Sequence, residues 1–199
     1  KKPHYVAGHS LGEYNALFAA GAYDFTTGLK LVKKRAELMS WVSGGGMAAV
    51  IGLSGDRVEK ILKNSGEERV EIANYNAPHQ IVLAGSRDDI GRLNSLFEKE
   101  GARYIPLNVS GAFHSSYMAN LKSELREYLD QFIFSDLTIP VISNVTARPY
   151  RQGDVISNLT EQVTNPVRWT DSVRYLMGRG ELEFEEIGPG NVLTGLVGS

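Results

Sequence analysis

The sequence predicts an α/β protein in which a small subdomain is inserted into a larger one. Residues 4–20 follow the order strand, sharp turn, helix. Apolar runs of strand length then alternate with segments that have the period of an amphipathic helix, first over 47–107 and again over 115–199. The length of 199 residues fits one domain, or one domain with a subdomain.

The first part of the chain contains one predicted strand and two predicted helices. The strand covers 4–7, and the first helix covers 13–20. The second helix is predicted over 24–42, with Asp24 or Thr26 as its cap. Its apolar face consists of Leu31, Val32, Leu38, Met39 and Val42. The triple glycine that follows is interpreted as a flexible joint or subdomain boundary.

The middle of the chain predicts a compact βαββαβ unit. Its elements are a strand at 47–52, a helix at 55–64, strands at 70–73 and 80–84 with a turn at 74–78 between them, a helix at 88–100 and a strand at 103–107. This order is the split βαβ arrangement of a ferredoxin-like unit. We therefore expect a ferredoxin-like small subdomain over 44–107, and a larger subdomain formed by 1–43 and 108–199.

The last part of the chain returns to the larger subdomain. Helices are predicted at 115–131, 155–163 and 171–178, and strands at 139–143 and 182–187. A Gly-Pro-Gly turn at 188–190 leads into a final helix.

Composition excludes several classes of protein. The chain is 42% hydrophobic and 22% charged, with a formal net charge of −2, which argues against nucleic acid or an anionic membrane as the main partner. It has no cysteine, so disulfides, thiolate zinc sites and a cysteine nucleophile are excluded. No apolar run approaches the roughly 18 residues of a membrane span, and no signal peptide is visible. We expect a cytoplasmic location. We also expect the chain to be a fragment of a longer protein, because it starts Lys-Lys-Pro without methionine.

Ser10 is the first candidate for chemistry. It is the centre of a G-x-S-x-G pentapeptide at 8–12, between the predicted strand and helix. In that setting the motif forms a nucleophile elbow, in which the two glycines leave room for a strained turn. The helix directs its N-terminal N–H groups and positive dipole end at the same place. The alternative is an ordinary glycine-containing turn.

An activated serine needs a base, and His114 is the best candidate among four histidines. It lies in a loop between a predicted strand and helix, where catalytic groups are common, although a lone loop histidine is more often solvated. His9 is adjacent to Ser10, and we expect it to pack or form hydrogen bonds locally. His4 lies in the first strand, and His79 lies in a polar turn where we expect it to be solvated.

Arg35 is the second unusual residue, because it falls on the apolar face of its helix. A buried guanidinium needs an anionic partner. Two interpretations remain open, an internal salt bridge and a clamp for a substrate carboxylate. Glu13 is expected only to suit the helix dipole, and Asn144 to line a polar surface. Nothing in the sequence resembles a phosphate loop, a metal cluster or a glycosidase carboxylate pair.

Taken together, these motifs resemble the malonyl-CoA:acyl-carrier-protein acyltransferases, in the same order along the chain. The matching stretches are G-H-S-L-G-E-Y at 8–14, R-x-x-L-M at 35–39, G-M-A-A-V-I-G at 46–52, G-A-F-H-S at 111–115, N-P-V-R-W at 165–169 and G-P-G-N-V-L-T-G-L at 188–196. Two further stretches, K-K-R-A-E-L-M at 33–39 and N-V-T-A-R-P at 144–149, resemble the free-standing acyltransferases that serve polyketide synthases in trans.

The resemblance implies a fold and an activity. The fold would be an α/β-hydrolase-like large subdomain with a ferredoxin-like insertion. The activity would be ping-pong transfer of a malonyl group from coenzyme A to an acyl carrier protein, for fatty-acid or polyketide synthesis. Malonyl-CoA and the carrier protein would be the partners, with no further cofactor, no metal, no nucleic acid and no membrane.

The resemblance also implies roles for six residues. Ser10 would be the nucleophile and His114 its base, oriented by the backbone carbonyl of Gln162. Arg35 would bind the malonyl carboxylate, and the Leu11 N–H would be one oxyanion donor. Phe113, in the Gly-Ala-Phe-His form of its loop, would favour malonyl over methylmalonyl units by crowding the extra methyl group.

One departure keeps two other hypotheses open. The family carries an N-terminal Gly-Gln-Gly segment that supplies a second oxyanion donor and the first strand, and these 199 residues do not contain it. The chain could instead be an acyl hydrolase that clears carrier proteins with water as acceptor, or a non-catalytic module that only docks a carrier protein. A hydrolase of longer acyl groups would gain nothing from Arg35, and a docking surface would need none of Ser10, His114 and Arg35.

Overall fold

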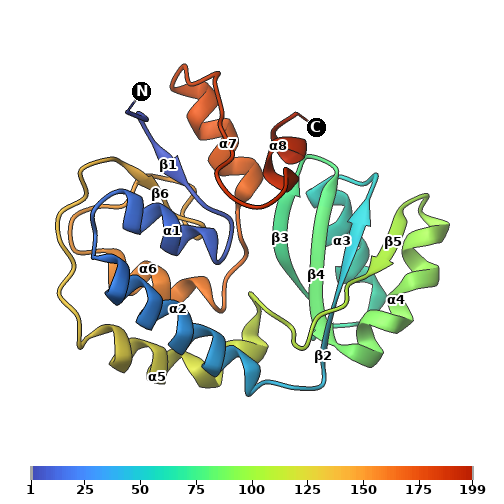
Figure 1. The fold of residues 1–199 in the computed structure, drawn as a ribbon. Helices are drawn as coiled ribbons and strands as arrows, with labels where there is room; N and C mark the ends of the chain where they lie inside the picture. Colours follow the sequence, from blue (N-terminus) through green and yellow to red (C-terminus); the bar gives the residue numbers. More distant parts are fainter. Residues whose placement is uncertain (1, 199) are drawn as a thin grey trace.

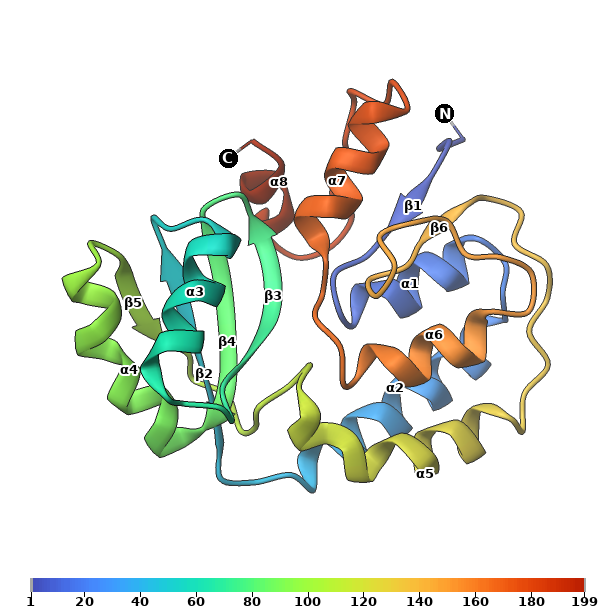
Figure 2. The same ribbon diagram turned by 180° about the vertical axis from the view of Figure 1, so that it is seen from behind.

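The computed structural model describes residues 2–198 and has the α/β architecture that the sequence predicts. Figures 1 and 2 show two parts side by side, one built around a sheet and one built mainly of helices. The elements in chain order are β1 (Val6–Ala7), α1 (Gly12–Ala19), α2 (Phe25–Ser40), β2 (Gly45–Ile51), α3 (Gly55–Ser65), β3 (Glu71–Ala77), β4 (Gln80–Ser86), α4 (Arg87–Lys99), β5 (Arg103–Pro106), the 3₁₀ helix η1 (Ser116–Met118), α5 (Ala119–Leu129), β6 (Val141–Ile142), α6 (Val155–Gln162), α7 (Trp169–Gly178) and α8 (Val192–Val197).

The four-stranded sheet has the order β3-β4-β2-β5, and every neighbouring pair is antiparallel. Alternating residues of its strands face opposite sides. Ala48 and Val50 of β2 pack with α3 and α4, while Met47 and Ala49 face the loop that leads to η1. The sheet therefore has one face covered by helices and one alanine-rich face against the loop that carries His114.

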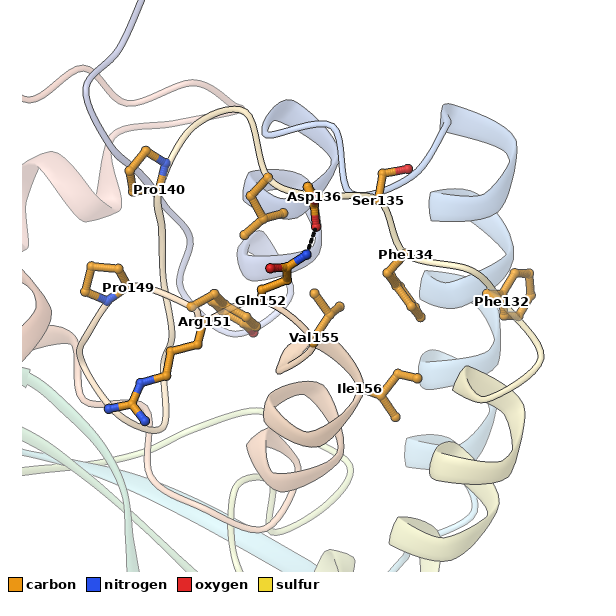
Figure 3. A pocket seen from close by; sticks show the side chains of 13 residues that line it. Phe132, Phe134, Ser135, Asp136, Pro140, Pro149, Arg151, Gln152, Val155 and Ile156 are labelled. Carbon is orange, nitrogen blue, oxygen red and sulfur yellow. Dashed lines mark hydrogen bonds between the residues drawn. The ribbon is translucent and has the colours of Figure 1, made fainter.

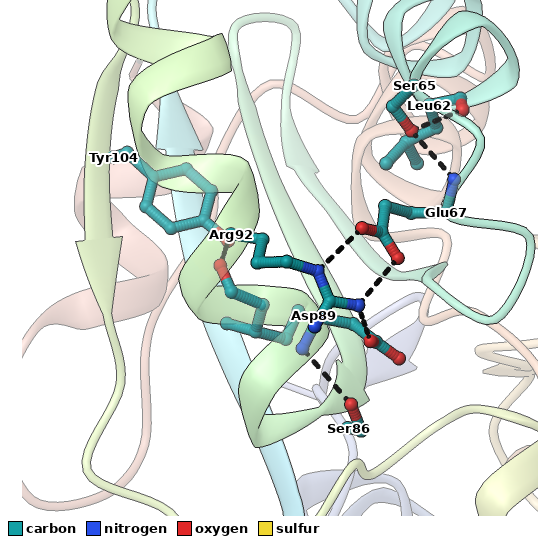
Figure 4. Close-up of polar contacts among 8 residues, drawn as sticks. Leu62, Ser65, Glu67, Ser86, Asp89, Arg92 and Tyr104 are labelled. Carbon is teal, nitrogen blue, oxygen red and sulfur yellow. Dashed lines mark hydrogen bonds and ion pairs between the residues drawn. The ribbon is translucent and has the colours of Figure 1, made fainter.

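Helix α4 is tied down at its first turn (Figure 4). The Ser86 hydroxyl accepts a hydrogen bond from the Asp89 amide at 3.1 Å and so caps the helix. The Arg92 guanidinium pairs with Asp89 in the same helix and donates to Glu67, 2.8 Å away, in the turn before β3. These contacts fix α4 to the edge of the sheet where β3 begins.

Two turns differ from the sequence-based expectation. Strand β3 continues to Ala77, so the predicted turn at 74–78 shrinks to Pro78 and His79. Gly45 and Gly46 begin β2 and pair with β4, so the triple glycine is not a free joint. A Cβ atom on Gly45 would lie 2.3 Å from the Ala112 amide nitrogen. Glycine is therefore needed where β2 passes the loop before His114.

The helical part surrounds a short parallel sheet. Strand β1 pairs with β6, and the pairs are Val6 with Val141 and Ala7 with Ile142. Both strands are shorter than predicted. The core between helices α1, α2, α5 and α6 includes Tyr14, Leu17, Leu31, Leu38, Met118, Leu121, Leu125, Leu129 and Leu159. Helix α2 begins as predicted, because the Asp24 carboxylate accepts a hydrogen bond from the Thr27 amide at 2.7 Å.

The predicted strand at 182–187 is wrong. Residues 181–187 have no regular secondary structure, and Leu182 and Ile187 are 79% and 85% exposed. A strand needs a neighbour for its backbone N–H and C=O groups, and no strand of residues 2–198 pairs with this segment. Helices α7 and α8 flank it and pack on Val167 through Trp169, Val173 and Leu193.

Candidate active site

Ser10 occupies a strained turn between β1 and α1. Its φ is +52°, a left-handed backbone conformation that a residue with a side chain rarely adopts and that clusters at functional sites. A Cβ atom on Gly8 would lie 1.9 Å from the Gly12 carbonyl oxygen, whereas one on Gly12 meets nothing within 4 Å in the described chain. The expectation that both glycines make room for the turn is therefore correct for Gly8 and wrong for Gly12.

Asn144 holds this turn in place. It follows β6, the strand beside β1, and it is buried. Its side-chain oxygen accepts a hydrogen bond from the Ser10 amide at 2.7 Å, and its side-chain nitrogen donates to the Gly8 carbonyl at 2.7 Å. From the sequence, Asn144 is expected only to provide polar lining after a strand. The signal for its role in the Ser10 turn was its position just after β6, the strand that pairs with β1.

Ser10 and His114 meet as predicted. The Ser10 Oγ lies 2.7 Å from His114 Nε2, and His114 Nδ1 lies 2.8 Å from the Gln162 backbone oxygen. A carbonyl oxygen can only accept, so Nδ1 carries the hydrogen and Nε2 is the acceptor for the Ser10 hydroxyl. This is the tautomer that a general base requires.

The His114 ring is kept neutral. Its backbone is left-handed, with φ +58°, and its side chain is buried. Burial and the nearby Arg35 charge lower the pKa of His114 to about 3, although the hydrogen bond to Gln162 works in the opposite direction. At neutral pH the imidazole is therefore free to take a proton.

Arg35 lies at the same place. One guanidinium nitrogen donates to Ser10 Oγ at 2.9 Å and to the Gln162 side-chain oxygen at 3.2 Å, and the guanidinium carbon lies 5.6 Å from the centre of the Tyr14 ring. Arg35 is 6% exposed, and its Nε atom has no hydrogen-bond partner in the described chain. No carboxylate of residues 2–198 pairs with it, so the internal salt bridge that the sequence left open is not formed.

Glu13 is the most deeply buried acid near the site. Its carboxyl group accepts hydrogen bonds from the Asn144 amide at 2.9 Å, from the Tyr150 hydroxyl at 2.7 Å and from the Gln162 side chain. Burial raises the pKa of Glu13 to about 7, although these three bonds and the Arg35 charge lower it. Glu13 thus connects α1 to the strand ends and to α6, well beyond the dipole role expected from its position.

The remaining predicted residues surround this centre. No residue of the described chain accepts a hydrogen bond from the Leu11 amide at the start of α1. Phe113 is partly buried between the helical core and the sheet face. His9 Nε2 lies 2.8 Å from Asn76 Oδ1 of β3, so this ring points to the sheet. His4 and His79 are exposed and take no part in the site.

A large hollow of the molecule lies elsewhere (Figure 3). It has a volume of about 560 Å³, and its lining includes Phe134, Pro149, Tyr150 and Ile156, but none of Ser10, Arg35 and His114. Within residues 2–198 no three histidine, aspartate or glutamate side chains gather as metal ligands. In the same range, every helix is too short or too polar to cross a membrane.

A strained serine, a neutral histidine and an arginine without a carboxylate partner in the described chain therefore meet at Ser10 Oγ.

The family model for the acyl transferase domain matches residues 1–197. The chain belongs to the acyl transferase family. Membership confirms the resemblance found in the sequence and makes the chain part of an acyltransferase enzyme.

Among the relatives of this acyl transferase chain is the polyketide biosynthesis malonyl CoA-acyl carrier protein transacylase BaeC of Bacillus velezensis. The two are 57% identical over 198 residues, which are 98% of this chain and 68% of BaeC. A crystal structure of a malonyl CoA-acyl carrier protein transacylase from Burkholderia pseudomallei is 48% identical, with a TM-score of 0.96 over 100% of this chain and 70% of that one.

A second structure contains a partner. It is a malonyl-transacylase in complex with its type II polyketide synthase acyl carrier protein, and it is 36% identical with a TM-score of 0.94. The alignment covers 99% of this chain and 66% of that chain. The acyl transferase chain thus spans about two thirds of the length of these relatives.

Proposed function

We propose that the full-length protein transfers a malonyl group from malonyl-CoA to the phosphopantetheine thiol of an acyl carrier protein. The observation that carries the proposal is the contact of Ser10 Oγ with both His114 Nε2 and the Arg35 guanidinium. A nucleophile paired with a base supports acyl transfer in general, and the adjacent unpaired cation supports an acyl group with a free carboxylate.

In the first half-reaction, His114 removes the proton from Ser10 as Oγ attacks the thioester carbonyl. The negative oxygen of the tetrahedral intermediate is held by the Leu11 N–H at the start of α1. The C–S bond then breaks, His114 returns the proton to the sulfur, and coenzyme A leaves as a thiol. Because a thiol has a pKa near 8.5, it departs easily, and an uncharged carbonyl is a sufficient partner for His114.

In the second half-reaction, the carrier-protein thiol gives its proton to His114 and attacks the malonyl-Ser10 ester. The C–O bond breaks, Ser10 recovers the proton, and the malonyl group leaves on the carrier protein. The malonyl-Ser10 ester is formed in the first half-reaction and consumed in the second, after coenzyme A has left, so the kinetics are ping-pong. An acyl carrier protein as partner is supported by the neighbouring structure that contains one.

Selectivity is assigned to two side chains. Arg35 binds the malonyl carboxylate, since a buried guanidinium left unpaired by an acetyl group disfavours that substrate. Phe113 stands one residue from His114 and packs against both cores, where it limits the room for a methyl branch. The name of BaeC supports polyketide synthesis as the pathway.

The fold supports the division into two subdomains. We assign 44–107 to a ferredoxin-like small subdomain on the basis of its βαββαβ order and its antiparallel β3-β4-β2-β5 sheet. Residues 1–43 and 108–199 are assigned to an α/β-hydrolase-like catalytic subdomain, on the basis of the strand–elbow–helix at Ser10 and the parallel pairing of β1 with β6.

Arg35→Ala in the full-length protein tests this function against the two alternatives. We expect kcat/KM for malonyl transfer to fall by about 10²-fold or more, and acetyl transfer to change far less, because only malonyl loses an ion pair. The measurement is transfer of each labelled acyl group to an acyl carrier protein. Equal losses for both substrates would contradict the clamp. Release of free acid without transfer would favour a hydrolase, and absence of any turnover by the wild-type protein would favour a docking module.

A further inference from the structure

The side chain of Gln162 lies between the buried carboxyl group of Glu13 and the buried guanidinium of Arg35. Its Nε2 donates to the Ser10 carbonyl at 2.9 Å and also to the Glu13 carboxyl group, while its Oε1 accepts from Arg35 at 3.2 Å. The orientation of this amide is fixed by its partners, since the Ser10 carbonyl only accepts and the guanidinium only donates. Gln162 itself is completely buried.

This arrangement keeps Glu13 and Arg35 from pairing with each other. Both side chains are buried, and each influences the pKa of the other, yet no ion pair joins them. Without an intervening group, the two charges would gain strongly by direct contact in this poorly solvated place. The neutral amide offers each of them one hydrogen bond and occupies the space between them.

We propose that the Gln162 side chain is a positioning residue that holds Arg35 unpaired for the carboxylate of the acyl substrate. The inference rests on the proposed function. It is separate from the role of the Gln162 backbone, whose carbonyl oxygen contacts His114. Gln162 thus positions His114 through its main chain and Arg35 through its side chain. A substitution at 162 changes the contact with Arg35 but keeps the backbone carbonyl that orients His114.

Two substitutions in the full-length protein test this inference. Gln162→Glu places a carboxylate against Arg35, and Gln162→Met keeps the side-chain length but removes the amide that separates Arg35 from Glu13. In both variants we expect kcat/KM for malonyl-CoA to fall by about 10²-fold, mainly through a higher KM, and at least about tenfold more than kcat/KM for acetyl-CoA, which responds only to the lost hydrogen bond to the Ser10 carbonyl. Gln131→Glu, at an exposed position after α5, is the control for an added charge.

A second measurement separates a lost clamp from a damaged site. Hydrolysis of the uncharged ester p-nitrophenyl acetate needs Ser10 and His114 but no carboxylate clamp. Because the Gln162 side chain also donates to the Ser10 carbonyl, we expect both variants to lose part of this activity, but at least about tenfold less than they lose of malonyl transfer. If either folded variant keeps the wild-type preference for malonyl over acetyl, or loses both substrates and the ester reaction equally, the inference is wrong. If the wild-type protein itself transfers no malonyl group, it is the proposed function that fails.

Discussion

In the proposed mechanism His114 is the base, and its surroundings keep its ring in the neutral form. Its ring is buried, contacts an uncharged carbonyl at Gln162 and lies near the positive charge of Arg35. A carboxylate partner would stabilise the imidazolium, whereas these neighbours destabilise it. The ring therefore stays unprotonated at neutral pH, and an imidazolium formed when it takes the Ser10 proton readily passes that proton to a departing thiol.

The lowered pKa of His114 makes folding stability depend on pH. The folded-state pKa of about 3 lies below the unfolded value of 6.5, so the unfolded chain binds the extra proton first. This contribution to stability is complete above pH 6.5 and is lost as the pH falls from 6.5 toward 3. Relative to His114→Gln, we expect the wild type to lose up to about 1.4 kcal/mol of unfolding free energy per pH unit in that window.

Urea titrations of both proteins between pH 7 and pH 4 measure this difference, and Gln131→Glu serves as an exposed control. Parallel pH dependence of the wild type and His114→Gln would show that His114 titrates like a solvated histidine in the folded protein.

Residue types in their local context were enough to single out Ser10, His114 and Arg35 as candidates. They were not enough for the groups that hold them. Asn144 and Glu13 meet across 131 positions of sequence, and the Gln162 side chain meets Ser10 across 152. Such contacts depend on how β6 and α6 pack beside the Ser10 turn, and no local pattern encodes that packing.

Among the elements, those with a clear helical period were predicted most accurately. Helices α2, α3 and α4 begin and end within two residues of their predicted bounds, because their apolar faces and caps are encoded locally. The strands that depend on a partner were predicted less well. Strands β1 and β6 are only two residues long, and residues 182–187 form no strand at all.

The Ser10 turn offers a matched pair of glycine substitutions. Gly8→Ala would bring a methyl group within 1.9 Å of the Gly12 carbonyl, so the backbone must move, and we expect a loss of about 1–3 kcal/mol in unfolding free energy together with most of the transfer activity. Gly12→Ala meets nothing in the described chain, and alanine favours a helix by about 1 kcal/mol, so we expect it to be neutral or stabilising. Denaturant unfolding measures both, and equal destabilisation would contradict this account of the turn.

In the whole molecule, the site lies at the junction of the two parts. The His9 ring next to the nucleophile bonds to Asn76 of β3, and Val167 exchanges backbone hydrogen bonds with Ala73 and Tyr75 of the same strand. The loop that carries His114 packs on the alanine-rich face of the sheet. The sheet therefore supports the loop that carries His114. Ser10 directly precedes α1 and Arg35 lies on α2, and both helices belong to the other part (Figure 1).

The central claim is that Ser10 carries the malonyl group between the two half-reactions. The most direct test is the intact mass of the full-length protein after brief exposure to malonyl-CoA without any carrier protein. We predict a mass increase of one malonyl group, located on the peptide that contains Ser10, absent in Ser10→Ala and discharged when an acyl carrier protein with its phosphopantetheine arm is added. A wild-type protein that transfers malonyl groups yet never shows this adduct, or carries it on another residue, would contradict the account.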